Sequence, residues 1–176
     1  MLATADDIKR LREETSCGVI ECKKALEESK GDFEKAKDIL RKRGLELAAK
    51  KGGRTAAEGR IESYIHSGSK IGVMLEVNCV TDFVAQNADF AKFAKDVAMH
   101  IAATSPKYIK REDVPADVLK EQKDTETFFK ETCLMDQPFV KDASKSIQDI
   151  LNDLIASIGE NIFIRRFVRF KVNQVE

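Results

Sequence analysis

The sequence predicts an α+β protein, in which a small three-helix domain precedes a core domain where helices pack on a small antiparallel sheet. Three observations lead to this prediction. In several segments apolar residues recur three and four positions apart, which is typical of amphipathic helices. Two neighbouring segments alternate apolar and polar residues around a Ser-Gly-Ser turn, as the strands of a hairpin do. Strands and helices are segregated along the chain, which favours α+β over a parallel α/β sheet.

The first 44 residues carry the signals of three short helices. Thr4 and Asp7 fit a capping box at the start of the first helix. A second helix follows from Val19, and Asp32 can cap a third that we expect to end at Gly44. The residues expected to face inward are Ile8, Leu11, Ile20, Ala25, Leu26, Phe33, Ala36, Ile39 and Leu40. A bundle of this size is near the lower limit for independent folding, so we expect a docking module.

The remainder of the chain predicts strands and helices of a second domain. We expect strands at Gly59–His66, Lys70–Asn78 and Asn161–Asn173. Helices should begin at Asn87 or Ala88, near Pro115 with continuation through Leu119 toward Phe128, and at Ser144 with an end at Ile158. The basic stretch Leu45–Ala57 is interpreted as a linker. The predicted domains are therefore a docking domain with its linker at 1–54 and an α+β core, or dimerisation, domain at 55–176.

Charge and composition narrow the class of partner. Apolar residues make up 43% of the chain and charged residues 34%, and the net charge is zero. Residues 1–54 hold 14 Lys or Arg and 11 Asp or Glu, a net charge of +3, which leaves −3 for residues 55–176. Neither part has the basic excess of a protein that binds the phosphate backbone, so a protein partner is favoured over a nucleic acid.

The sequence also bears on location. No apolar run approaches the roughly 18 residues that a membrane-spanning helix needs. The N-terminal residues MLATADDIKR lack the apolar segment of a signal peptide. The simplest interpretation is a cytoplasmic protein with no membrane partner, and an organelle protein whose transit peptide has been removed would look the same.

Candidate catalytic groups are few. The four cysteines are scattered without a CxxC pair, and the chain has two histidines, His66 and His100. Structural zinc usually shows paired ligands at short spacing, so a zinc enzyme is only a third alternative. There is no GxGxxG, P-loop, HExxH or GxSxG motif. We therefore expect no active site, no cofactor or metal, and no direct nucleotide binding.

The strand Phe163–Lys171 interleaves aromatic and basic residues. Such a strand can form a stacking platform for single-stranded nucleic acid, and this gives the alternative function, a nucleic-acid- or ribosome-associated protein. Strand alternation gives a simpler account, in which the strand is covered on both sides. One face would carry Ile162, Ile164, Arg166, Val168, Phe170 and Val172, and the other Phe163, Arg165, Phe167, Arg169 and Lys171. A two-sided apolar strand also fits a homodimer formed through the sheet.

The segment NCVTDFVAQN, Asn78–Asn87, lies at a predicted strand-to-helix junction. In one interpretation Thr81 or Asp82 caps a helix and Phe83 folds back into the core. In the other, Phe83 is an exposed anchor for a partner, since aromatic anchors dominate protein–protein interfaces. The pattern leaves both interpretations open.

Several motifs in register resemble the elongation factor Ts family over nearly the whole chain. They are LREETSCGVIECKKALEESKGDFEKAKDILRKRG (Leu11–Gly44), NCVTDFVAQN, MHIAATSP (Met99–Pro106), QPFVKD (Gln137–Asp142) and IGENIFIRR (Ile158–Arg166). The resemblance implies a guanine-nucleotide exchange factor for the GTPase elongation factor Tu in its GDP-bound form. It also implies that the three-helix domain is ubiquitin-associated-like and docks on the GTPase domain.

The resemblance further implies roles for particular residues. Thr81, Asp82, Phe83 and Val84 form the loop that enters the GTPase near its magnesium, with Phe83 as a wedge between helices and Asp82 nearest the metal. The partner-docking positions are Arg12, Val19, Ile20 and Lys23.

The chain departs from the family in three ways. Most members have Gly-Ala-Gly-Met-Met where this chain has Ser16-Cys17-Gly18-Val19-Ile20. Members with which we compare it carry a further helical segment between the helix after Pro115 and the QPFV motif, and Lys120–Met135 is too short to contain it. Long members have two copies of the core, whereas this chain has one. In the family the short form goes with a homodimer, which implies a 2:2 complex.

Overall fold

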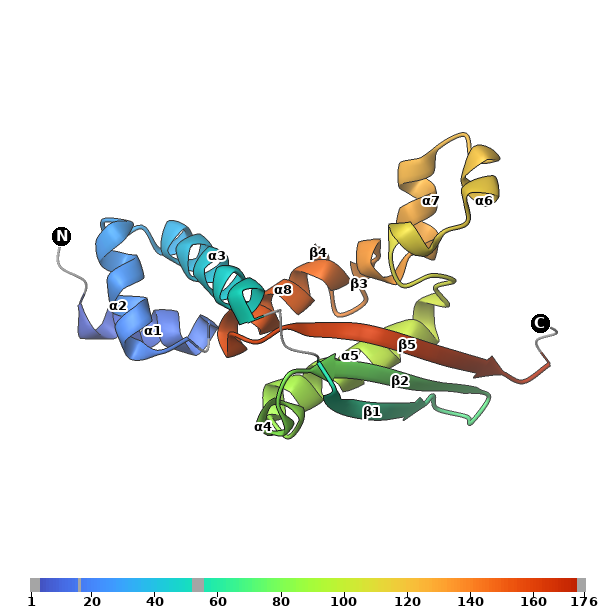
Figure 1. The fold of residues 1–176 in the computed structure, drawn as a ribbon, viewed down its shortest axis with the longest axis horizontal. Helices are drawn as coiled ribbons and strands as arrows, with labels where there is room; N and C mark the ends of the chain where they lie inside the picture. Colours follow the sequence, from blue (N-terminus) through green and yellow to red (C-terminus); the bar gives the residue numbers. More distant parts are fainter. Residues whose placement is uncertain (1–3, 16, 52–55, 174–176) are drawn as a thin grey trace. The chain divides into compact units, whose positions relative to one another are not determined.

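The computed structural model describes residues 4–15, 17–51 and 56–173 of the 176-residue chain. It confirms the α+β class: the described residues form helices and a small antiparallel sheet (Figure 1). They group into two compact units, one from the described residues of 1–55 together with 152–161, and the other from 56–151 together with the described residues of 162–176. The sequence did not predict that 152–161 join the N-terminal unit. The assignment of 1–54 and 55–176 as docking and dimerisation domains stays a prediction.

The N-terminal unit contains the three predicted helices. They are α1 (Ala5–Thr15), α2 (Val19–Glu28) and α3 (Phe33–Lys51). The capping box is present, since the Asp7 amide donates to Thr4 Oγ1 at 3.2 Å and the Thr4 amide donates to Asp7 Oδ2 at 3.2 Å. Asp32 caps α3 by accepting a hydrogen bond from the Lys35 amide. The helices share a core of Leu11, Cys22, Ala25, Leu26, Ala36 and Leu40.

Two predictions for this unit are wrong. Gly44 does not end the third helix, because α3 continues through it to Lys51. A Cβ placed on Gly44 would lie 2.3 Å from the Cα and the carbonyl oxygen of Ala156, in helix α8 (Ile147–Ile158). The glycine is therefore needed for close helix packing and not for a stop. Ile20, expected to face inward, is 68% exposed.

The second unit is built on the antiparallel sheet β1-β2-β5. Its strands are β1 (Glu58–Ile65), β2 (Ile71–Cys79) and β5 (Ile162–Lys171). Helix α5 (Ala88–Thr104) lies along one face of this sheet (Figure 1). The fully or nearly fully buried side chains of these elements are Val73, Leu75, Val77, Phe90, Val97, Ile101, Ile162 and Ile164. We call the opposite face, which exposes Ile61, Ile65, Met74, Val168 and Phe170, the outer face of the sheet.

A β-bulge in β5 corrects the predicted faces of this strand. Glu76 pairs with Arg166 but the next residue of β2 pairs with Ile164, so Arg165 is an extra residue in β5. A bulge reverses the alternation beyond it. Val168 and Phe170, expected beside Ile164, are exposed on the outer face instead.

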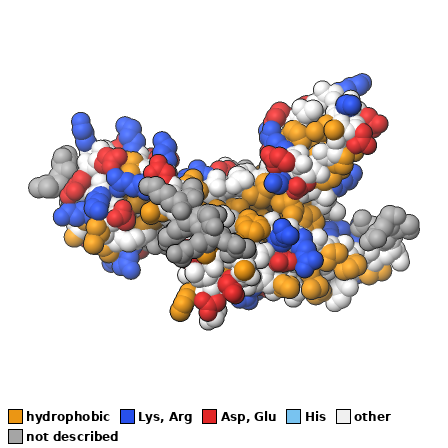
Figure 2. All heavy atoms as spheres, in the orientation of Figure 1, with side chains coloured by type: hydrophobic (Ala, Val, Ile, Leu, Met, Phe, Trp, Pro, Cys, Tyr) orange, Lys and Arg blue, Asp and Glu red, His pale blue; other side chains and the backbone are white. Residues whose placement is uncertain are grey.

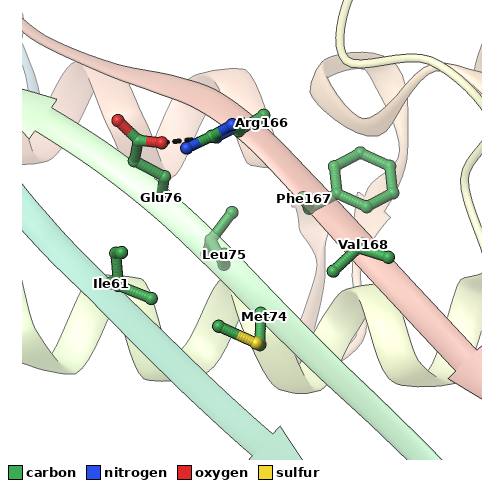
Figure 3. Close-up of a pocket in the computed structure, with 7 residues that line it drawn as sticks. All are labelled: Ile61, Met74, Leu75, Glu76, Arg166, Phe167 and Val168. Atoms are coloured by element: carbon green, nitrogen blue, oxygen red, sulfur yellow. Dashed lines mark hydrogen bonds and ion pairs between the residues drawn. The ribbon is translucent and has the colours of Figure 1, made fainter.

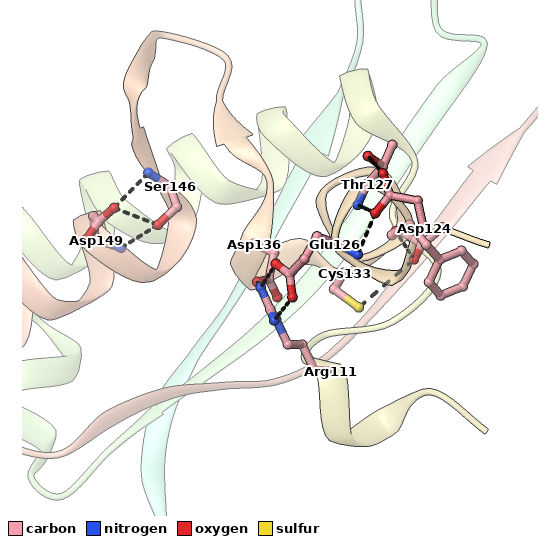
Figure 4. Close-up of polar contacts among 10 residues, drawn as sticks. Arg111, Asp124, Glu126, Thr127, Cys133, Asp136, Ser146 and Asp149 are labelled. Atoms are coloured by element: carbon pink, nitrogen blue, oxygen red, sulfur yellow. Dashed lines mark hydrogen bonds and ion pairs between the residues drawn. The ribbon is translucent and has the colours of Figure 1, made fainter. Parts of the chain in front are cut away.

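Two helix predictions in this unit also need correction. The helix after Pro115 does not continue toward Phe128 but is split into α6 (Ala116–Lys120) and α7 (Thr125–Thr132). Asp124 caps α7 by accepting hydrogen bonds from two amides, and this new start interrupts the run. Residues 144–146, expected to be helical, belong to β4 (Asp142–Ser146), which pairs with β3 (Pro138–Phe139). Ser146 caps α8 through reciprocal hydrogen bonds with Asp149 (Figure 4).

Arg111 holds α7 in place. It lies in a short 3-10 helix, Arg111–Asp113, and forms two hydrogen bonds with the Glu126 carboxylate, at 2.8 and 3.0 Å (Figure 4). Its Nε donates to Asp136 at 2.7 Å, in a second 3-10 helix, Leu134–Asp136. The guanidinium also lies 4.6 Å from the ring centre of Phe129. Arg111 thus ties the segment before α6 to α7 through Glu126 and Phe129, and to the segment after α7 through Asp136.

His100 links α5 to the segment after it through a buried polar cluster. Its side chain is fully buried, and its Nε2 lies 2.9 Å from Gln137 Oε1. The Val140 amide donates to Nδ1 at 3.4 Å, which assigns the proton of the neutral ring to Nε2. Burial lowers the pKa of His100 below its ordinary value of 6.5, although the hydrogen bond to Gln137 opposes this shift.

Gly44→Ala should destabilise the N-terminal unit by about 3 kcal/mol, because the new methyl group overlaps backbone atoms of Ala156 that no side-chain rotation can move. Urea unfolding monitored by circular dichroism measures this loss. Gly18→Ala is the control, since its added Cβ meets no atom within 4 Å. Equal stability of the two variants would contradict the close approach of α3 and α8.

The free energy of unfolding should fall as the pH drops below 6.5. The folded state disfavours protonated His100, so its contribution is complete above the unfolded pKa of 6.5 and is lost progressively as the pH falls toward the lower folded pKa. Urea titrations between pH 8 and pH 5.5 measure the slope. His100→Gln should flatten this slope. A slope that survives His100→Gln would assign the pH dependence to other groups.

Candidate functional site

The connection between β2 and α5 contains a single helical turn, α4 (Asp82–Ala85). Thr81 is its N-cap residue, with φ −122° and ψ 151°, and the Thr81 carbonyl accepts a hydrogen bond from the Ala85 amide at 3.2 Å. A helix start at this junction belonged to one of the two interpretations that the sequence left open. The cap forms through the backbone, since the Thr81 side chain makes no capping hydrogen bond.

Phe83 and Val84 point in opposite directions with respect to the core. Phe83 is 83% exposed, the largest exposed fraction among the large hydrophobic residues that the structure describes, whereas Val84 is 8% exposed. The interpretation in which Phe83 folds back into the core is therefore wrong. Val84 anchors the turn, and consecutive helical residues differ by about 100° in direction, so its neighbour is held outward.

Asp82 lies beside this exposed ring at the first position of α4. Its Oδ1 accepts a hydrogen bond from the Phe83 amide at 2.9 Å, and the residue is exposed. The turn therefore presents a carboxylate and an unpaired aromatic ring side by side. This combination is suited to a partner that offers an apolar pocket next to a cationic site.

The predicted docking residues lie in the N-terminal unit and are all exposed: Arg12 on α1 and Val19, Ile20 and Lys23 on α2. Val19 and Lys23 are one turn apart, and Lys23 forms an ion pair with Glu27 at 3.9 Å. Val19 and Ile20 are 51% and 68% exposed, so a large part of each side chain is uncovered within its own unit. These residues belong to the N-terminal unit and the α4 turn belongs to the second unit, so each group is a candidate surface of its own unit.

The outer face of the sheet is a third candidate surface, which sequence reasoning located only in part. On it Met74 lies directly opposite Val168. A shallow pocket on this face is lined by residues of all three strands, and the Glu76–Arg166 ion pair closes one side (Figure 3). Figure 2 shows hydrophobic side chains exposed over the sheet beside a group of basic ones. The sequence did contain one signal for this surface. Met74 lies between Val73 and Leu75, so an apolar residue occupies a position where an alternating strand would place a polar, solvent-facing one.

No disulfide joins the four cysteines, all of which lie in described parts of the chain. Burial is the main cause that raises the pKa of Cys17, Cys22 and Cys133, so these thiols stay protonated near neutral pH. Within the described ranges, no three His, Cys, Asp or Glu side chains gather as metal ligands would. None of the described helices combines the length and apolar character needed to span a bilayer.

Comparisons with known proteins give one family. The family model described as Elongation factor TS matches residues 6–127. The Elongation factor Ts of Thermodesulfovibrio yellowstonii is 50% identical over 198 aligned positions, which cover 100% of this chain and 99% of that protein. The Elongation factor Ts of Acetivibrio thermocellus is also 50% identical, with 97% of this chain and 90% of the relative covered. That of Caldanaerobacter subterraneus is 48% identical, with coverages of 97% and 96%.

The alignment with the first of these relatives is longer than the chain. It runs over 198 positions, whereas the chain has 176 residues, so at least 22 positions have no residue here. The resemblance had pointed to a missing helical segment between Lys120 and Met135, and the family match ends at residue 127, inside this stretch. In the structure this stretch holds the turn between α6 and α7, and Arg111 bonds Glu126 in α7. By the extent of the family match and the identity to these relatives, the chain belongs to the elongation factor Ts family, and membership implies in general terms nucleotide exchange on elongation factor Tu in translation elongation.

Proposed function

We propose that this chain promotes GDP release from elongation factor Tu by inserting the segment Thr81–Val84, the N-cap and first residues of the α4 turn, into the GTPase beside its magnesium site. The observation that carries the proposal is the 83% exposure of Phe83 next to the buried Val84. Transfer of a Phe side chain from water into an apolar pocket is worth about 1.5–3 kcal/mol. Because the packed Val84 holds the ring of Phe83 outward, this burial free energy can be gained only when the ring binds to a partner.

The wedge acts on GDP through the metal. Mg²⁺ requires near-ideal octahedral geometry, so a small displacement of the surrounding elements weakens its binding. Asp82, whose carboxylate is oriented by the Phe83 amide, brings negative charge to the same place. The coupling is reciprocal. The exchange protein and GDP each lower the GTPase's affinity for the other, and by the same ratio. No covalent bond is made or broken, so the activity needs no catalytic residues and no cofactor of its own.

Docking is the proposed role of the N-terminal unit, acting as the ubiquitin-associated-like domain of the family. Its exposed Val19 and Ile20 supply apolar contact area, and the exposed Arg12 and Lys23 supply positive charge. These contacts lie outside the α4 turn, so we assign them to affinity and not to the rate of GDP release. The compartment of the protein is then the one that holds elongation factor Tu, which for the cytoplasmic form predicted from the sequence is the cytoplasm.

A homodimer through the outer face of the sheet is the second part of the proposal, and it gives a 2:2 complex with the GTPase. The face exposes apolar side chains on all three strands, with Met74 and Phe170 51% and 61% exposed. A two-fold axis would bring two copies of this face together, and such self-complementary contacts are the commonest in homodimers. Two sheets packed in this way form a sandwich with a shared apolar core.

The alternative, nucleic-acid binding by Phe163–Lys171, has less support from the side chains. Arg166 is paired with Glu76 at 2.6 Å, and Arg169 donates to the Ala102 carbonyl at 3.1 Å. Both arginines are thus already engaged within the unit. A steep decrease of RNA affinity with salt would favour this alternative, because released counterions determine that slope.

Phe83→Ala should lower the maximum rate of GDP release at least about 30-fold, which corresponds to the roughly 2 kcal/mol of an interface hot spot. Stopped-flow release of fluorescent GDP from elongation factor Tu, at saturating factor, measures this rate. Val140→Ala, which trims an exposed apolar residue of the same unit, should leave it unchanged. Ile20→Ala should instead raise the factor concentration needed for half-maximal release. A wild-type maximum rate for Phe83→Ala would exclude the wedge.

Met74→Lys should convert the dimer to a monomer, because it places a charge at the centre of the outer face, opposite Val168. Sedimentation equilibrium measures the mass, and the rate of GDP release per chain is measured in parallel. Val140→Lys is the matched control, since it makes the same kind of replacement away from the sheet. A monomeric wild type at micromolar concentration would disprove the dimer and leave the exchange activity untouched.

A further inference from the structure

A helix of one turn does not hold its own position. Helix α4 has four residues, far fewer than an isolated helix needs for stability in water. The direction of Phe83 therefore depends on what fixes the two ends of the turn. The proposed function requires this direction to be maintained while the ring enters its pocket.

The N-terminal end of α4 is tied to the sheet. The Thr81 carbonyl accepts a hydrogen bond from the thiol of Cys79 at 3.2 Å, in addition to that from the Ala85 amide. Cys79 is the last residue of β2 and is fully buried. Thr81, at the start of the turn, is thus held in a fixed position relative to the core.

The C-terminal end of α4 is tied to α5 by one residue, Asn87. Its amide donates to the Val84 carbonyl at 3.0 Å and so closes the turn. Its side-chain Oδ1 accepts hydrogen bonds from the amides of Asp89 at 2.7 Å and Phe90 at 3.3 Å, and so caps α5. Its own conformation is extended, with φ −65° and ψ 138°, which places a bend between the two helices. Phe90 is fully buried, so the cap is attached to a rigid part of the unit.

We propose that Asn87 is a positioning residue for nucleotide exchange, which holds the α4 turn at a fixed angle to α5 and keeps Phe83 directed at its partner. The inference rests on the proposed wedge and names Asn87 as the residue that holds the wedge in position. Without the side-chain cap, the first turn of α5 loses two hydrogen bonds and the bend between α4 and α5 is no longer fixed. The ring of Phe83 then has to be ordered during insertion. The free energy spent on this ordering no longer contributes to weakening the binding of GDP.

The test compares Asn87→Ala with Asn87→Asp in stopped-flow GDP release from elongation factor Tu. Asn87→Ala should lower the maximum rate about fivefold, the typical effect of one lost N-cap, with little change in the half-saturating concentration. Asn87→Asp, which keeps an acceptor oxygen at the cap, should restore the rate. Asp124→Ala is the matched control, because it removes an N-cap with the same two-amide geometry from α7. It should leave the rate of exchange unchanged.

A double mutant separates positioning from general stability. In the Phe83→Ala background, Asn87→Ala should cause no further loss, because there is no ring left to position. The inference is overturned if Asn87→Ala releases GDP at the wild-type rate, if Asp124→Ala is equally slow, or if the fivefold loss persists without Phe83. A full rate for Phe83→Ala alone would instead overturn the wedge itself, so the two failures are distinguishable.

Discussion

The packing of α5 against β2 is the interaction on which the candidate site depends. Val73, Leu75 and Val77 of the strand and Phe90, Val97 and Ile101 of the helix are all fully buried. Both ends of the connection 80–87 therefore start from the same rigid core. A connection this short between two fixed ends has few available paths, and Val84 occupies the one inward position. Exposure of Phe83 follows from this geometry, and it is maintained because the core would have to open before the ring could turn inward.

Local sequence signals predicted those features of the fold that depend on neighbouring residues. The Thr4–Asp7 capping box, the Asp32 cap and the helix start at Asn87 are each set by a side chain that bonds an amide two or three residues later. Features decided by distant segments were mispredicted. Gly44 resembles a helix stop until Ala156 is known to lie against it. The bulge at Arg165 reverses the second half of β5, and its cause is the pairing with β2, which the strand's own alternation does not contain.

For the candidate site, too, the sequence predicted what neighbouring residues determine and left open what distant segments determine. The pattern of the TDFV segment allowed either a buried or an exposed Phe83, because a cap residue followed by an apolar pair fits both. Three-dimensional burial decides between them by assigning the inward position to Val84. The family resemblance supplied a role that no pattern of apolar spacing contains, since a pocket on another protein leaves no periodicity in this one. The outer face of the sheet was recognised only in part, because its composition depends on the bulge.

Two kinds of contact suit an exchange factor for a thermodynamic reason. A contact that is equally strong on the GDP-bound and the nucleotide-free partner raises affinity for both and leaves the affinity for GDP unchanged. Only contacts that are stronger when the nucleotide has left can weaken its binding. In the proposed mechanism Val19 and Ile20, outside the α4 turn, make contacts of the first kind, and the ring of Phe83 makes contacts of the second kind. For contacts of the second kind, the wedge must be held more rigidly than the elements of the partner that it displaces. In the proposed mechanism that requirement is met at Asn87, whose side chain accepts a hydrogen bond from the amide of the buried Phe90 at the start of α5.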